Sequence, residues 1–344
     1  MNSDIGLLAG VEDRLESLER PPVITMTTDF GERDGYVGTM KGVIFTLLPN
    51  AVVVDVSHQI APQQIHEGAF ILYRAYRYFP ASAIHIAVVD PGVGTSRRPI
   101  ALVTRHGTFI GPDNGIFTYV LRAEQGTEQS PETVNRPAWV GGMWGIAPSW
   151  AGQDADGEST STAEADEIGT SPIPQSDDLP RAYHLTASDY WLSSVSNTFH
   201  GRDIFAPIAA HLASGAHVER MAEQVGLDSL VSLPVGAPRI FQTSRNTTVV
   251  GQIVYLDHFG NIITNLPDRL LSPLLEEAVA TPMIEVGAYH IRGLVTSYGD
   301  VREGQALALI GSEKLLEIAV RNANAAHRMK VRIGDPVRVT VDRP

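Results

Sequence analysis

The chain has 344 residues, a formal net charge of −13, no cysteine and 43% hydrophobic residues. This length suggests two domains, and the apolar content is sufficient for a sizeable core. The absence of cysteine excludes disulfides, thiol nucleophiles and cysteine zinc sites, and the acidic balance argues against a nucleic acid as the main partner.

No apolar stretch of the sequence is long enough to predict a transmembrane helix, so we expect no membrane partner. Residues 1–21 are rich in acidic side chains and lack the basic start and apolar middle of a signal peptide. We predict an N-terminal extension there. The lack of cysteine also fits a reducing compartment, and we expect a cytoplasmic protein.

From residue 22 onward, strand-like and helix-like patterns alternate along the chain. The predicted strands are residues 23–28, 51–56 and 83–89, and the predicted helices are residues 37–47 and 63–78. Strands separated by helices are typical of βαβ units, and a hairpin is expected within residues 100–110. We therefore predict an α/β domain with a mainly parallel sheet over residues 22–236.

An acidic insertion interrupts this domain at about residues 126–181. Residues 153–178 contain many Asp and Glu, no Lys or Arg, and much Ser, Thr, Gly and Ala. Low hydrophobicity with charge of one sign predicts a mobile segment. These acids account for more than half of the net charge, so the bulk charge says little about the folded surface.

A second, all-β pattern follows a predicted linker at residues 234–243. Short strand-like runs with turns between them occupy residues 248–255, 261–266, 282–291, 307–310, 316–320 and 336–341. We predict a smaller, barrel-like β domain over residues 237–344.

The first candidate site is the run from Asp90 to Arg98, a glycine-rich turn directly after the predicted strand 83–89. Ligands of open α/β sheets usually bind at such strand ends. Asp90 and Arg97 could form an ion pair that pins the turn. Alternatively, Arg97 keeps the Asp90 carboxylate ionised so that it can orient or deprotonate a water molecule.

Two further strand-end or helix-start motifs carry polar side chains. His200, at the start of an apparent helix, is either a cap on the surface or a proton-transfer group beside the carboxylate, whereas Arg202 and Asp203 are expected to be structural. Asp29 follows the first predicted strand, where a carboxylate often binds a ribose diol, although a capping or turn role is equally compatible.

Other common chemistries have no sequence signature here. The chain lacks the HExxH and His-x-His spacings, the Gly-x-Ser-x-Gly elbow and the Walker loop. We expect no metal and no cofactor. The residues alone therefore indicate an α/β site with Asp90, Arg97, His200 and Asp29, and nothing sharper.

A set of motifs in one order extends this interpretation. They are Thr28-Asp29-Phe30-Gly31, Val54-Asp55-Val56-Ser57-His58, Glu67-Gly68-Ala69, Asp90-Pro91-Gly92-Val93-Gly94-Thr95, Pro112-Asp113-Asn114-Gly115, Phe199-His200-Gly201-Arg202-Asp203, Asp257-His258-Phe259-Gly260-Asn261 and Ile318-Ala319-Val320. As a set they resemble the S-adenosyl-L-methionine (SAM) hydroxide adenosyltransferase family, which is related to the SAM-dependent fluorinases and chlorinases.

The resemblance implies hydrolysis of SAM to adenosine and L-methionine, by in-line attack of an activated water or hydroxide on C5′ of the ribose. It also implies a homotrimer, with each site between the N-terminal domain of one subunit and the C-terminal domain of the next. Alternatives are an adenosyl halogenase and a non-catalytic protein that binds SAM or adenosine. The halogenases carry an aromatic residue where this chain has Asp90, which favours water as the nucleophile.

The resemblance also implies residue roles. Asp90, Arg97 and His200 match the family's catalytic trio. The expected substrate-binding residues are Asp29 for the ribose, Asn261 and Tyr298 for the adenine, Asp257 for the methionine ammonium and Ser312 for the methionine carboxylate. Two positions depart from the halogenases, where Gln63 replaces a Trp and Glu313 replaces a basic residue.

Overall fold

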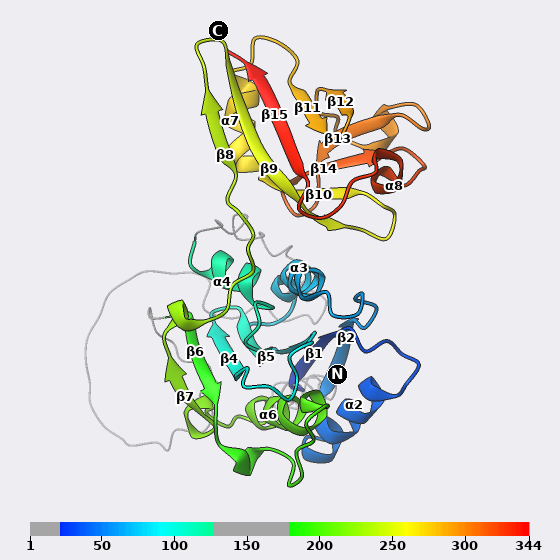
Figure 1. The fold of residues 1–344 in the computed structure, drawn as a ribbon. Helices are drawn as coiled ribbons and strands as arrows, with labels where there is room; N and C mark the ends of the chain where they lie inside the picture. The colour runs from blue at the N-terminus through cyan, green and yellow to red at the C-terminus, as the bar shows by residue number, and fades with distance from the viewer. Residues whose placement is uncertain (1–20, 127–178, 344) are drawn as a thin grey trace, which may run out of the picture. The chain divides into compact units, whose positions relative to one another are not determined.

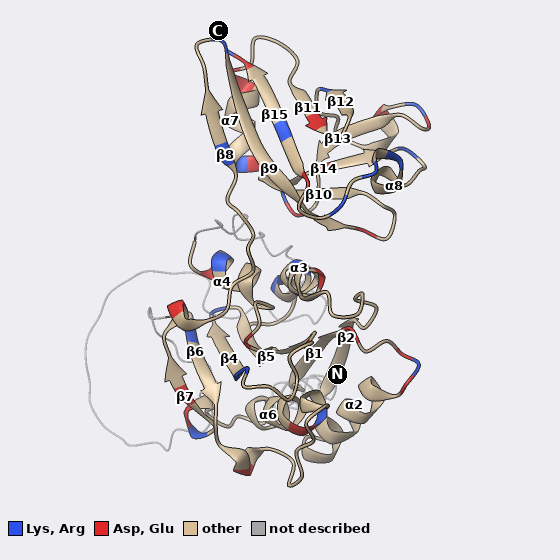
Figure 2. Ribbon diagram, viewed as in Figure 1, with Lys and Arg blue, Asp and Glu red and all other residues tan. Residues whose placement is uncertain are grey.

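The computed structural model describes residues 21–126 and 179–343. These residues form two compact units, and the boundary between them lies between Leu233 and Pro234 (Figure 1). The predicted N-terminal extension and acidic insertion therefore lie almost entirely outside the described residues. Those two segments carry nearly all of the net charge of −13, and Figure 2 shows acidic and basic residues interspersed over the described parts of both units.

The first unit is built on a seven-stranded sheet in the order β2-β1-β3-β5-β4-β6-β7. Its strands are β1 (Val23–Thr28), β2 (Val52–Ser57), β3 (Ile84–Val88), β4 (Pro99–Thr104), β5 (Gly107–Pro112), β6 (Arg181–Leu185) and β7 (Ala222–Val225). β1 pairs in parallel with β2 and β3, and β3 pairs in parallel with β5. Only β4 and β7 run against the other described strands of this sheet, so the predicted, mainly parallel sheet is confirmed.

Helices cover both faces of this sheet, with α2 and α6 on one side and α3 and α4 on the other (Figure 1). The α-helices are α2 (Tyr36–Leu47), α3 (Ile65–Ala75), α4 (Thr118–Glu124) and α6 (Ala206–Ala213). Single helical turns lie at Tyr76–Tyr78, Ser188–Tyr190, Val218–Arg220 and Leu227–Ser229, and a π-helical turn at Gly201–Phe205 leads into α6.

The core between α2, α6 and the sheet explains the helical spacing of α2. Met40 and Ile44, four residues apart, are fully buried on one face of this helix. They belong to one apolar cluster with Ile86 of β3 and Ile208 of α6. Burial of these side chains holds the two helices against the strands whose ends carry the candidate residues.

The second unit is an antiparallel sheet in the order β12-β11-β15-β9-β10-β14-β13, with β8 added to β9. Its elements are β8 (Arg239–Gln242), β9 (Asn246–Leu256), β10 (Ile262–Pro267), α7 (Asp268–Glu276), β11 (Met283–Val286), β12 (Tyr289–Arg292), β13 (Ala306–Ile310), β14 (Leu315–Val320), α8 (Ala325–Met329) and β15 (Pro336–Asp342), with a helical turn at Tyr298–Asp300. The two end strands approach each other, since the Val295 amide after β12 donates to the Ala308 carbonyl of β13 at 2.9 Å. The predicted barrel-like architecture is confirmed.

Two sequence predictions for this unit are corrected. The run predicted as one strand, residues 282–291, is a hairpin of β11 and β12, because the chain reverses at Gly287 with a positive φ of 55°. The second half of the predicted linker, residues 234–243, is strand β8, which pairs with β9 although its side chains are exposed. Within residues 21–126 and 179–343, none of the helices combines the length and apolar composition of a membrane span.

Candidate active site

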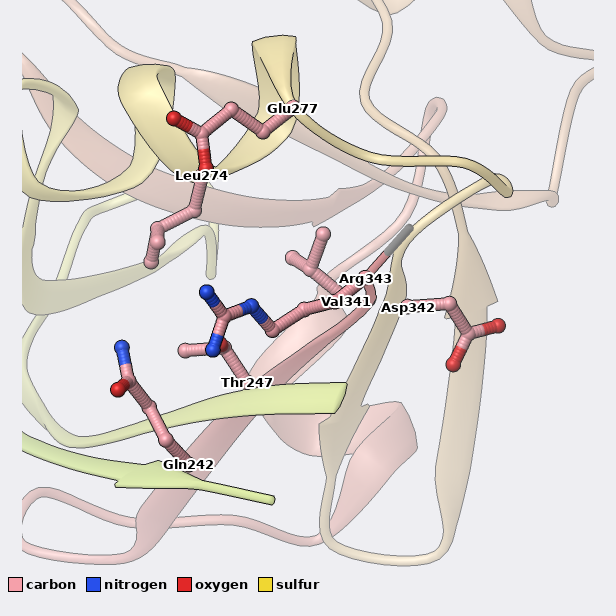
Figure 3. Close-up of a pocket in the computed structure, with 7 residues that line it drawn as sticks. All are labelled: Gln242, Thr247, Leu274, Glu277, Val341, Asp342 and Arg343. Atoms are coloured by element: carbon pink, nitrogen blue, oxygen red, sulfur yellow. The ribbon is translucent and has the colours of Figure 1, made fainter. Parts of the chain in front are cut away.

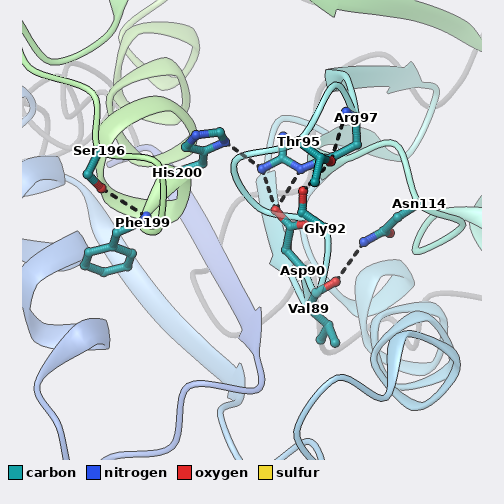
Figure 4. Close-up of polar contacts among 9 residues, drawn as sticks. All are labelled: Val89, Asp90, Gly92, Thr95, Arg97, Asn114, Ser196, Phe199 and His200. Atoms are coloured by element: carbon teal, nitrogen blue, oxygen red, sulfur yellow. Dashed lines mark hydrogen bonds and ion pairs between the residues drawn. The ribbon is translucent and has the colours of Figure 1, made fainter.

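Four neighbouring strands of the first unit end at the same edge of the sheet. Because β2, β1, β3 and β5 are parallel, the residues that follow them gather there: His58 after β2, Asp29 after β1, Asp90 shortly after β3 and Asn114 after β5. The Asn114 side chain donates to the carbonyl of Val89 at 2.8 Å and so fixes the residue next to Asp90 (Figure 4). The carboxyl edge of such a sheet is the usual place for a ligand.

Asp90 and Arg97 form a buried ion pair at this edge (Figure 4). Nε of Arg97 donates to Oδ2 of Asp90 at 2.8 Å, and Nη2 contacts the same oxygen. The two side chains are only 4% and 9% exposed. Oδ1 of Asp90 and Nη1 of Arg97 are also buried, and neither has a hydrogen-bond partner among the described residues. Since such groups are nearly always satisfied in folded proteins, this acceptor and this donor point to a bound molecule.

His200 extends the pair to a trio. Nη2 of Arg97 lies 2.7 Å from Nδ1 of His200, and because a guanidinium can only donate, Nδ1 is the acceptor. Burial lowers the pKa of His200, and the charge of Arg97 adds to this effect against the opposing influence of Asp90 and Asp203. The ring is therefore neutral near pH 7, and its hydrogen is on Nε2.

The segment that carries His200 is held by a buried carboxylate. Asp203 is fully buried, accepts the Ser196 amide at 2.8 Å and pairs with the Arg202 guanidinium at 2.5 Å. The Ser196 hydroxyl in turn accepts the Phe199 amide at 3.1 Å (Figure 4). Arg202 and Asp203 thus have the predicted structural role. The side chain of His200 does not cap the helical turn that it precedes, so the capping interpretation is wrong.

Asp29 lies in the turn after β1 and does not cap a helix, since Gly35 is the residue before α2. Its Oδ2 accepts the backbone amide of Gln63 at 2.8 Å. Gln63 adopts the left-handed region with φ of 67°, which is rare for a residue with a side chain and is typical of functional sites. The carboxylate is therefore held by a loop from the neighbouring strand-to-helix connection.

In the second unit, the structure brings Asp257 and Asn261 together. Oδ1 of Asp257 accepts the amides of Phe259 and Asn261, at 2.9 and 2.8 Å, and Oδ2 accepts the side-chain amide of Asn261 at 2.9 Å. Asp257 therefore orients the buried Asn261 amide. Phe259 in the same turn is 72% exposed.

Tyr298 and Ser312, the other predicted residues of this unit, each contact a glutamate. The Tyr298 hydroxyl donates to Oε1 of Glu317 on β14 at 2.5 Å, and its side chain is 45% exposed. The Ser312 hydroxyl donates to Oε1 of Glu313 at 3.1 Å. A carboxylate beside Ser312 opposes the approach of a second carboxylate.

The cavity shown in Figure 3 is separate from all of these residues. It has a volume of about 50 Å³ and is lined by Gln242, Thr247, Leu274, Glu277, Val341, Asp342 and Arg343. This volume suits a few water molecules and not a nucleoside, and the buried Thr247 hydroxyl, which has no partner within the described chain, fits a water there. The described residues contain no cluster of three or more His, Asp and Glu side chains arranged to bind a metal.

An α/β unit with polar side chains gathered at the carboxyl edge of its sheet is typical of a protein that binds a ligand there, and comparison with known proteins identifies its family. The chain matches the SAM hydroxide adenosyltransferase N-terminal domain at residues 24–140 and 169–222, and the C-terminal domain at residues 251–338. The chain belongs to this family and is an enzyme. The predicted family resemblance is confirmed.

Individual relatives match the chain over nearly its whole length. An (R)-S-adenosyl-L-methionine hydrolase of Salinispora tropica is 34% identical, over 93% of this chain and 98% of the relative. A fluorinase of Nocardia brasiliensis is 24% identical, over 94% and 98% of the two chains. The crystal structure of an uncharacterized conserved protein from Thermotoga maritima has a TM-score of 0.68 and 28% identity, covering 92% of this chain and 99% of that one.

Proposed function

We propose that this enzyme hydrolyses SAM to adenosine and L-methionine. The observation that carries the proposal is Oδ1 of Asp90, a buried carboxylate oxygen that has no hydrogen-bond partner among the described residues. A water molecule can donate a hydrogen bond to this oxygen, so Asp90, which Arg97 fixes through Oδ2, can hold and aim a nucleophilic water. The hydrolase relative, at higher identity than the fluorinase, supports the same conclusion.

The hydrolysis requires little beyond a water molecule that is oriented toward C5′ of the ribose. The water oxygen forms a bond to C5′ of the ribose, while the C5′–S bond breaks and its electron pair stays on sulfur. Methionine leaves as a neutral thioether, so no acid is needed for the leaving group. The water proton goes to Oδ1 of Asp90, because Oδ2 is engaged by Arg97 and Nδ1 of His200 accepts from the same arginine. Neutral His200 keeps Arg97 in place.

The proposed substrate is the epimer that the hydrolase relatives name, (R)-S-adenosyl-L-methionine. Attack at C5′ must be in line with the C5′–S bond, so the enzyme has to orient the sulfonium. Supplying each sulfonium epimer separately tests this point. Faster turnover of the S epimer would contradict it.

We carry the substrate contacts over as part of the same proposal. Asp29 binds the ribose diol, Asn261 and Tyr298 contact the adenine, and Asp257 and Ser312 meet the amino-acid end. The adenine contacts are supported by the side-chain amide of Asn261, which Asp257 orients, and by the exposed ring of Tyr298. The contact of Ser312 with Glu313 makes Ser312 the weakest of these assignments.

No metal or cofactor enters this mechanism, because the sulfonium already activates C5′. Activity that is unchanged by a chelator is the expected result. We further infer a homotrimer with sites shared between subunits and a cytoplasmic location, as the family resemblance and composition imply. Activity recovered by mixing inactive Asp90→Asn and Asn261→Ala subunits would support shared sites, and light scattering measures the oligomeric state.

The decisive experiment is chromatography of SAM after incubation with the pure protein. Wild-type protein is expected to form adenosine and methionine, whereas Asp90→Asn, which keeps the shape of the side chain, lowers kcat by about 10²- to 10⁴-fold and still binds adenosine. Full turnover by Asp90→Asn would contradict the proposed role of Asp90 in the mechanism.

Two alternatives are separate outcomes of this experiment. Formation of 5′-chloro-5′-deoxyadenosine in the presence of chloride would indicate a halogenase, although a buried carboxylate repels a halide. Calorimetric binding of SAM without any product would indicate a non-catalytic binding protein.

A further inference from the structure

A chain of side chains extends from the surface of the first unit to the turn that carries Asp29. Nδ1 of His58 lies 2.8 Å from the hydroxyl of Thr28, the last residue of β1. Nε2 of His58 lies 2.9 Å from Oδ1 of Asp55, and Oδ2 of Asp55 pairs with Nζ of Lys41 at 2.6 Å. The side chain of His58 is only 2% exposed, and Thr28 is fully buried. None of these residues belongs to the trio.

The direction of this chain follows from the charges. The Nε2–Asp55 contact is close but lacks the alignment of a hydrogen bond, so we treat it as electrostatic. A carboxylate attracts an N–H and repels a lone pair, which places a ring hydrogen on Nε2. The Thr28 hydroxyl oxygen already accepts the Phe30 amide, so its own hydrogen is free to donate to Nδ1. Nδ1 is then the acceptor, and the Thr28 hydroxyl donates to it.

His58 and Thr28 together fix the backbone of the turn. The Thr28 hydroxyl oxygen accepts the amide of Phe30 at 3.2 Å. The His58 carbonyl oxygen accepts the amide of Gly31 at 2.8 Å. Asp29 follows Thr28 and directly precedes these two tethered amides, and its own carboxylate accepts the Gln63 amide at 2.8 Å. The turn is thus tied on both sides of Asp29.

We propose that His58 is a positioning residue that acts through Thr28 to aim the Asp29 carboxylate at the vicinal hydroxyls of the substrate's ribose. This inference rests on the proposed function, since it assumes that Asp29 binds the diol. A carboxylate that binds two hydroxyls must keep its orientation to within a fraction of an ångström. A buried histidine that only filled space would not need the acceptor that His58 presents to Thr28.

The test compares variants that keep or remove the acceptor. His58→Asn retains an oxygen near the position of Nδ1, whereas His58→Leu has no acceptor. Thr28→Ser and Thr28→Val form the same pair on the other side of the hydrogen bond. We expect the Leu and Val variants to raise KM about tenfold with a smaller change in kcat, and the Asn and Ser variants to stay close to wild type.

A second readout separates positioning from a loss of fold. Calorimetry with adenosine and 2′,3′-dideoxyadenosine gives a selectivity for the diol, and a structural role alone would weaken both ligands equally. The proposal expects His58→Leu and Thr28→Val to lose about tenfold of this selectivity. In an Asp29→Asn background the same substitutions should have no further effect on selectivity, since their path runs through Asp29.

The outcomes are distinct for the two proposals. If the wild-type protein forms no adenosine from SAM but His58→Leu and Thr28→Val lose the preference for adenosine over the dideoxy ligand, the proposed hydrolysis is contradicted and the role of His58 is supported. Folded His58→Leu and Thr28→Val proteins with wild-type diol selectivity would overturn the positioning role, whatever the turnover. The positioning role would also be overturned if His58→Leu and Thr28→Val lowered the diol selectivity as much in the Asp29→Asn background as in the wild-type background.

Discussion

Gly94 packs directly against the carbonyl oxygen of Asn197: a Cβ built on Gly94 would come within 2.3 Å of that oxygen. Gly94 lies in the loop of Asp90 and Arg97, and Asn197 lies three residues before His200. Its φ of 78° is also one that residues with a side chain rarely adopt. This close approach of two loops, distant in sequence, is what allows Arg97 to reach His200 at 2.7 Å.

Gly94→Ala should therefore separate the two loops. An alanine must either leave the left-handed region or push Asn197 away, and a shift of about 1 Å at a catalytic group can lower a rate by about 10²-fold. We expect kcat to fall by at least tenfold, together with a stability loss of about 1–3 kcal/mol from the strained backbone and the contact. Steady-state kinetics and urea unfolding measure the two effects.

Gly215→Ala is the matched control for this substitution. Gly215 follows α6 with a φ of 98°, and a Cβ there would meet no atom of the described residues within 4 Å. This variant bears the backbone strain without the clash, so its stability should fall while kcat stays unchanged. Equal losses of kcat in both variants would refute the argument from loop approach.

Adjacent arginines have different roles, which a pair of substitutions should separate. Arg98 donates to Oδ2 of Asp113 at 2.9 and 2.5 Å and to the Ser229 carbonyl at 2.6 Å, so it ties β5 to the segment that leads out of the unit. Arg98→Met leaves the buried Asp113 carboxylate without this partner and should cost about 2 kcal/mol of stability with little change in kcat. Arg97→Met should lower kcat by about 10²-fold.

Thermal unfolding and steady-state kinetics on both variants check this division. The paired design matters because both substitutions remove one cation from neighbouring positions. A large loss of kcat in a folded Arg98→Met protein would show that the neighbouring arginine also serves the reaction.

The pH dependence of the rate should reflect His200. Its pKa is lowered by burial and by the charge of Arg97, so the neutral, accepting form persists below the ordinary histidine value. As the pH falls through this lowered pKa, Nδ1 gains a proton and can no longer accept from Arg97. We expect kcat/KM to be constant from about pH 6.5 upward and to fall only below it.

His200→Asn is the comparison for this pH profile. Its side-chain oxygen can accept from Arg97 without titrating, so the decline near the histidine range should disappear. If the decline keeps its position in His200→Asn, another group causes it.

The stability of the first unit should weaken in mild acid because of His85. This residue is fully buried, its Nδ1 lies 2.8 Å from the Thr25 hydroxyl, and burial lowers its pKa to about 3. Between pH 6.5 and about 3 the unfolded chain binds a proton that the folded chain does not, so the free energy of unfolding falls as the pH falls. The slope approaches about 1.4 kcal/mol per pH unit.

Urea unfolding at several pH values, with His85→Asn as the reference, measures this contribution. The variant keeps an acceptor for Thr25 and loses the titrating ring. The slope below pH 6.5 should be smaller in the variant than in the wild type. Parallel slopes would contradict a buried neutral His85.

Most strands and helices were predictable because their signals are local. The predicted strand at residues 23–28 coincides with β1, and α2 begins one residue before the helix predicted at residues 37–47 and ends at the same residue. The predictions that were wrong concern a tight reversal at Gly287 and a strand, β8, whose exposed side chains give no alternating pattern. Pairing with β9 makes β8 a strand, and that partner is not visible in its own sequence.

In the candidate site, too, local features were predictable from the sequence and long-range contacts were not. The sequence by itself determined which residue types could do the chemistry, since a carboxylate at a strand end, a glycine turn, an arginine and a histidine are all readable as motifs. Tertiary structure alone decided that Oδ1 of Asp90 has no partner among the described residues, that Nδ1 of His200 accepts from Arg97 and that His58 contacts Thr28 beside Asp29. The reason is physical: hydrogen bonds between residues 30 and 103 positions apart depend on strand order and loop approach, which no local pattern encodes.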